Sequence, residues 1–260
     1  MIKQEFLLPE IEGEDQNLET FDPNAFVGND KDEQKTCNFV LMLALFFNDL
    51  KNLVWAFRQL KNTLPKNADS PSVYNGHHGG FEVHIQRLFW ACVFELTDSI
   101  KNNENAIKHS LFVKTIHSLP QERQRLWDEL YQFSVGSKIN KFSNKLLEEL
   151  AQHRNNIAFH YSQNKVIANG YKDFFAPQSA NLHSNPLKVP YISRAASMAE
   201  TKFYFADAAA QECLKKFDPY ATELKNLVKE NILKTVGSIV INFIQVRGFA
   251  WQKPQTAEQE

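Results

Sequence analysis

The chain has 260 residues, with 29 basic and 30 acidic side chains and a net charge of −1. A hydrophobic fraction of 43% beside 23% charged residues is ordinary for a folded protein, which excludes a largely disordered chain or a fibrous repeat. Because the net charge is close to zero, no overall positive field gathers nucleic acid, and any contact with nucleic acid must be local.

Cysteine usage and the N-terminal composition favour a cytoplasmic protein. Cys37, Cys92 and Cys213 are odd in number and far apart, as expected of thiols in a reducing compartment. The N-terminal residues are acidic and lack the basic and apolar segments of a signal peptide. The most apolar run, Phe39 to Phe47, is shorter than the roughly 18 residues that span a bilayer. We therefore expect no membrane contact.

The residue pattern predicts an all-α protein. Only 9 glycines occur in the chain, and long segments of helix-forming residues separate the clusters of Pro and Gly. A first helix is expected from about residue 32 to 64, ending before Pro65, and a second from Phe81 after an irregular segment over 65–80. The later helices are expected at 104–118, 120–135, 140–161, 197–217 and 219–246, with less regular structure favoured by Ile and Val over 236–246.

These elements predict one main domain. The expected parts are an N-terminal arm over 1–30, a helical bundle over 31–163, a long loop over 164–195, C-terminal helices over 196–252 that pack on the same domain, and a disordered tail over 253–260.

One segment has chemical character, the sequence HRNNIAFHY over residues 153–161. On an ideal helix Arg154 falls on the apolar stripe, and a guanidinium there needs an anionic partner, an interface or a solvent-filled cleft. Glu95 and Asp98 on the second helix are candidate partners within the chain. His160 lies about 120° around the helix from Arg154 and about 9 Å along it, so the two side chains are neighbours without direct contact.

Arg154, Asn155 and His160 resemble the motif of the HEPN superfamily, in which Arg and a polar residue precede His after a gap of four to six residues. The resemblance implies a HEPN-like helical bundle with additional C-terminal helices. It also implies metal-independent RNA cleavage, without a cofactor, at a site shared by two copies of the chain. By this resemblance the chain is expected to act as a toxin or a phage-defence effector.

The resemblance also implies roles for single residues. His160 would be the general acid or base, Arg154 the phosphate-binding group, and Asn155 the group that orients the phosphate or the imidazole. Five neighbouring residues are expected to contact RNA: Lys138, Lys141, Lys145, His153 and Tyr161. Expected partners are RNA, a second copy of the chain, and an antitoxin or other partner protein. DNA is not expected.

Other interpretations remain open at this stage. The chain is alternatively a non-catalytic helical module for dimerisation or protein interaction, with Arg154 paired to an acid of its own chain. His77, His78 and His84 suggest a metal site, but histidines in a Gly-rich segment without a Cys or carboxylate pattern are more often a solvated turn, and no metal is expected. The lysines are alternatively a solvated face, and Arg58 and Arg87 either contact phosphate or pair with acids.

Overall fold

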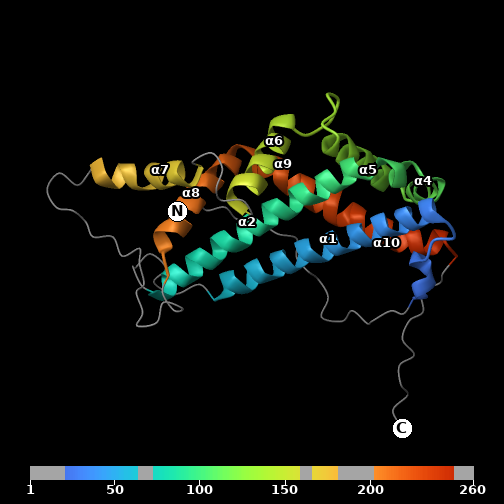
Figure 1. Cartoon of the computed structure of the whole chain (residues 1–260), viewed down its shortest axis with the longest axis horizontal. Coiled ribbons are helices and arrows are strands. Elements are labelled where there is room, and N and C mark those ends of the chain that lie inside the picture. Colours follow the sequence, from blue (N-terminus) through green and yellow to red (C-terminus); the bar gives the residue numbers. More distant parts are fainter. Residues whose placement is uncertain (1–20, 64–72, 159–165, 181–201, 249–260) are drawn as a thin grey trace, which may run out of the picture. The chain divides into compact units, whose positions relative to one another are not determined.

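The computed structural model of the chain describes residues 21–63, 73–158, 166–180 and 202–248 (Figure 1). Across these residues the protein is helical and contains no β-strand, which confirms the predicted all-α class. The first elements are η1 (Pro23–Phe26), α1 (Lys31–Asn62), α2 (Val73–Asn102), α3 (Glu104–Lys108), α4 (Ser110–His117), α5 (Gln121–Ser134) and α6 (Asn144–His153). They are followed by η2 (Arg154–Ala158), α7 (Val166–Ala180), α8 (Tyr204–Leu214), η4 (Lys215–Tyr220), α9 (Ala221–Asn226), η5 (Leu227–Lys234) and α10 (Thr235–Val246).

The chain divides into two compact units. Unit 1 comprises residues 1–49, 96–144 and 222–260, and unit 2 comprises residues 50–95 and 145–221. The division falls inside α1 and inside α2, so each of these helices supplies residues to both units.

Aromatic side chains form much of the core of unit 1. The rings of Phe39 and Phe112 lie 5.3 Å apart, and Phe112 is also 5.3 Å from Trp127. Phe26 of η1 stacks on Phe243 of α10 at 5.7 Å. Because Phe39, Phe112 and Phe243 are almost fully buried, they contribute strongly to the apolar area that holds α1, α4, α5 and α10 together.

The start of α1 is fixed by an N-terminal cap. The Asp30 carboxylate accepts hydrogen bonds from the backbone N–H groups of Glu33, at 2.8 Å, and Asp32, at 2.9 Å. These two bonds lower the pKa of Asp30 because they stabilise its charged form.

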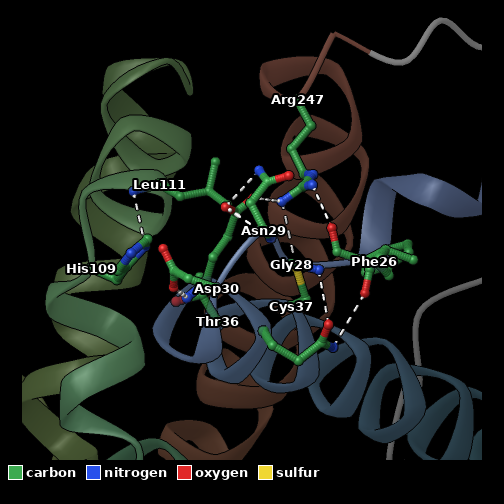
Figure 2. A network of polar contacts seen from close by, with 12 residues as sticks. Phe26, Gly28, Asn29, Asp30, Thr36, Cys37, His109, Leu111 and Arg247 are labelled. Atoms are coloured by element: carbon green, nitrogen blue, oxygen red, sulfur yellow. Dashed lines mark hydrogen bonds and ion pairs between the residues drawn. The ribbon is translucent and has the colours of Figure 1, made fainter.

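Arg247, directly after α10, joins the end of the described chain to its beginning. Its guanidinium forms an ion pair with Glu33 and donates to the backbone oxygen of Val27 at 2.7 Å. It also lies 3.6 Å from the sulfur of Cys37 (Figure 2). The side chain is only 9% exposed, so this ion pair is largely removed from solvent.

In unit 2, α7 packs along α8. A glycine allows this approach, because a Cβ atom on Gly170 would overlap the backbone oxygen of Ala209 and lie 2.5 Å from the sulfur of Cys213. Lys216 of η4 forms an ion pair with Glu149 of α6 at 3.1 Å, which links these two segments of the unit.

The prediction of irregular structure is wrong in part for two segments. The second helix was expected near Phe81 but begins at Val73, and it continues through the glycines that were interpreted as a loop. The first half of the expected loop over 164–195 is the helix α7. In both segments a glycine lies against α8, and tertiary contact offsets the intrinsic cost of about 1 kcal/mol for glycine in a helix.

Other boundaries also differ from the prediction. The helix expected over 104–118 is two helices, because His109 has an extended backbone and caps α4 by accepting from the N–H of Leu111 at 3.4 Å. The helix expected over 140–161 begins only at Asn144. The segment expected to be less regular is the helix α10, and a π-helical segment, η5, precedes it.

Candidate functional site

Arg154 and Asn155 lie directly after α6, in the π-helical turn η2 of unit 2. The Arg154 Nε donates to the Glu95 carboxylate at 2.5 Å, and its Nη1 donates to the Asn155 side-chain oxygen at 2.9 Å. The side chains of Arg154 and Glu95 are 32% and 33% exposed. Glu95 is one of the two acids that the sequence offered as candidate partners, and it is the one that forms the ion pair with Arg154.

Arg87 of α2 holds the end of the π-helical turn. Its Nε donates to the backbone oxygen of Ile157 at 2.9 Å, and its Nη2 donates to that of Ala158 at 3.4 Å. The guanidinium supplies donors for these two backbone oxygens. Arg87 therefore anchors the segment that carries Arg154, from a position 70 residues away in sequence from Ile157.

His153, the last residue of α6, is fully buried. Its Nε2 lies 3.0 Å from the backbone oxygen of Arg87, which can only accept, so Nε2 carries the proton. Its ring also contacts that of Phe217, with the centroids 5.4 Å apart. Burial lowers the pKa of His153 to about 3, and the imidazole is neutral at physiological pH. The prediction that His153 contacts RNA is wrong, because the side chain has no access to solvent.

The structure describes three of the remaining predicted site residues, Lys138, Lys141 and Lys145. His160 and Tyr161 lie outside the described residues. Lys138 and Lys141 are exposed residues of unit 1, where Lys141 forms an ion pair with Glu129 at 3.2 Å. Lys145 is exposed on α6 of unit 2.

The histidines near the start of α2 have separate surroundings. His78 is buried, and its Nε2 donates to the backbone oxygen of Leu60 at 2.8 Å, which ties α2 to the end of α1 within unit 2. The ring of His77 meets that of Tyr204 edge to face at 5.7 Å. In the described parts of the chain, no group of three or more His, Cys, Asp or Glu side chains is arranged to hold a metal ion.

Unit 2 also contains a cavity of about 600 Å³ beside these histidines. The end of α1, the first half of α2 and the start of α8 surround it, and its polar lining includes Arg87, His84, Lys202 and Asp207. Sequence analysis did not single out Lys202 or Asp207. The only local signal was the spacing of two glycines, Gly76 and Gly80, which share one face of α2 and allow α8 to approach.

Comparison with known proteins gives no identification: no family model, no curated protein and no solved structure matches this chain.

Length and composition single out one described helix, α1, as able to cross a membrane. An 18-residue window of α1 has a mean hydropathy of 1.4, and 28% of that window is buried. The core helix of a soluble protein passes the same test, so the expected absence of membrane contact stays a prediction.

Proposed function

We propose that the chain is a metal-independent endoribonuclease of HEPN type that uses Arg154, Asn155 and His160. The observation that carries this proposal is the position of Arg154: its guanidinium is partly exposed, fixed at Nε by Glu95 and at Nη1 by Asn155. An oriented guanidinium is suited to bind phosphate and to stabilise the charge that develops on it during cleavage. The general acid or base, His160, is assigned from the sequence motif.

The proposed reaction needs no metal ion. An imidazole accepts the proton of the ribose 2′-hydroxyl, the 2′-oxygen attacks the adjacent phosphorus, and the 5′-oxygen leaves with a proton from a second acid. The products are a 2′,3′-cyclic phosphate end and a 5′-hydroxyl end. Two copies of the chain supply two such motifs, and a role as a toxin or phage-defence effector is part of the same proposal.

A second candidate is a non-catalytic helical module for dimerisation or protein interaction. The Arg154–Glu95 ion pair favours it, because a guanidinium neutralised within its own chain has less attraction for a phosphate. The ribonuclease proposal requires RNA to bind the guanidinium beside Glu95 or to displace that carboxylate. The two candidates therefore predict different effects of removing the charge of Glu95.

The experiment compares RNA cleavage by purified wild type, Arg154→Ala, His160→Ala and Glu95→Gln, with EDTA present. His117→Ala is a matched control, because His117 is an exposed histidine of unit 1. A ribonuclease loses about 10²-fold or more of its activity in the first two variants, and retains or gains activity in Glu95→Gln. No cleavage by any protein, together with a dimer weakened by both Arg154→Ala and Glu95→Gln, supports the interaction module instead.

A further inference from the structure

The polar cavity of unit 2 is built around a close approach of two helices. A Cβ atom on Gly80 of α2 would lie 2.5 Å from the Asp207 carboxylate of α8, and one on Gly76 would lie 2.6 Å from the ring of Tyr204. The carboxylate of Asp207 therefore rests directly against the backbone of α2. The cavity has a volume of about 600 Å³, which is within the range of small-molecule sites in proteins.

Positive charges outnumber negative ones among the described residues that line this cavity. Arg87 and Lys202 line it with positive charge, and Asp207 is the one acidic residue among its lining side chains in the described parts of the chain. Burial lowers the pKa of His84, and the nearby positive charge of Arg87 lowers it further, which favours the neutral imidazole. Among the described lining residues the positive charges thus exceed the negative charge by one, which favours an anion.

The carboxylate of Asp207 forms no hydrogen bond or ion pair with any residue that the structure describes, although the side chain is partly buried. Burial raises the pKa of Asp207, and the nearby charges of Arg87 and Lys202 oppose this rise and favour the ionised form. A partly buried carboxylate without a donor is costly, and a ligand that supplies an O–H group would relieve this cost.

We propose that this cavity binds hydrogenphosphate, with Arg87 and Lys202 contacting its unprotonated oxygens and its P–OH group donating to the Asp207 carboxylate. Inorganic phosphate keeps at least one P–OH group at neutral pH, whereas sulfate has none. The carboxylate therefore selects phosphate, because it accepts a hydrogen bond from phosphate and repels sulfate. The P–OH group that donates to Asp207 is present on the free phosphate ion and also on a singly protonated phosphate monoester. This site is separate from the Arg154–Glu95 pair, and the proposal does not rest on RNA cleavage.

The test is isothermal titration calorimetry of the full chain with inorganic phosphate and, separately, with sulfate. We expect phosphate to bind at least about tenfold more tightly than sulfate, the effect of one hydrogen bond to a charged group. Wild type that binds neither ion, or binds both equally, overturns the proposal. A further titration with glycerol phosphate identifies the source: tighter binding than inorganic phosphate indicates a monoester, and weaker binding indicates the free ion.

Two variants test the assigned contacts. Asp207→Asn removes the repulsion between the carboxylate and sulfate, so we expect sulfate to bind more tightly. The ratio of the phosphate affinity to the sulfate affinity then falls towards one. Lys202→Gln changes an exposed residue, and we expect it to weaken the binding of phosphate and of sulfate about tenfold. The control is Lys172→Gln, which changes an exposed lysine of α7 outside the cavity lining and leaves the binding of both ions unchanged. An unchanged preference in folded Asp207→Asn overturns the selection mechanism. Should Asp207→Asn fail to keep the wild-type circular dichroism, Lys202→Gln decides: equal binding by Lys202→Gln and wild type refutes the site.

Discussion

His153 makes the stability of unit 2 depend on pH in a way that one substitution isolates. The imidazole is fully buried and neutral, and its pKa is about 3 in the folded protein against 6.5 for an ordinary histidine. We consider His153→Gln, because a glutamine amide is neutral at every pH and retains an N–H donor for the backbone oxygen of Arg87.

The sign of this pH dependence follows from whether the folded or the unfolded state binds the proton. Above the ordinary pKa of 6.5 both states are neutral, and His153 contributes nothing to the pH dependence. Below it the unfolded chain takes up a proton that the folded protein excludes, so the free energy of unfolding falls by about 1.4 kcal/mol per pH unit. This loss continues down to the folded pKa of about 3. Between neutral pH and about pH 5 it amounts to about 2 kcal/mol.

The assay is urea denaturation of wild type and His153→Gln, monitored by circular dichroism, at neutral pH and at about pH 5. All other titrating groups are common to the two proteins, so the difference between their pH dependences belongs to His153. We expect wild type to lose about 2 kcal/mol more than the variant on acidification. A difference below about 0.5 kcal/mol would show that His153 is hydrated or protonated in the folded state.

Three further substitutions test the packing. Arg247→Met should destabilise unit 1 by about 3 kcal/mol or more, measured by urea denaturation, because it leaves the largely buried carboxylate of Glu33 without its cationic partner. An effect below about 1 kcal/mol would contradict a desolvated ion pair. Gly170→Ala should lower the melting temperature, since its Cβ overlaps the backbone of Ala209, and an unchanged melting temperature would argue against the close approach of α7 and α8. Asn231→Leu should cost about 1 to 3 kcal/mol in denaturant, because its buried amide donates to a backbone oxygen of α5 at 3.0 Å, and a neutral effect would refute that bond.

Much of the helical core follows from local sequence. Apolar residues recur along α1 at spacings of about three and four, and Phe39, Leu43, Leu50 and Val54 are the buried members of this pattern. The same pattern relates Leu146, Leu150 and Ile157 of the motif segment, which are also buried. These residues were predictable because burial at spacings of three and four depends only on the geometry of one helix.

The candidate site was less predictable. The ideal-helix argument found that Arg154 needs a partner and named Glu95 among two choices, but it assumed an α-helix where the structure has a π-helical turn. The prediction that His153 contacts RNA was also wrong, because that side chain is enclosed. Both errors arise because contacts with α2 determine the backbone and the burial at this position, and local periodicity contains no information about them.

The sequence alone determines the all-helical class, the apolar faces of the helices and the segment in which chemistry is expected. Tertiary structure decides that α2 begins before its glycines and that Arg87 anchors the turn after α6. It also decides that Lys202 and Asp207 line one cavity. Helix formation depends on neighbouring residues, whereas these features depend on pairs far apart in the chain, and folding of the whole unit is needed to bring them into contact.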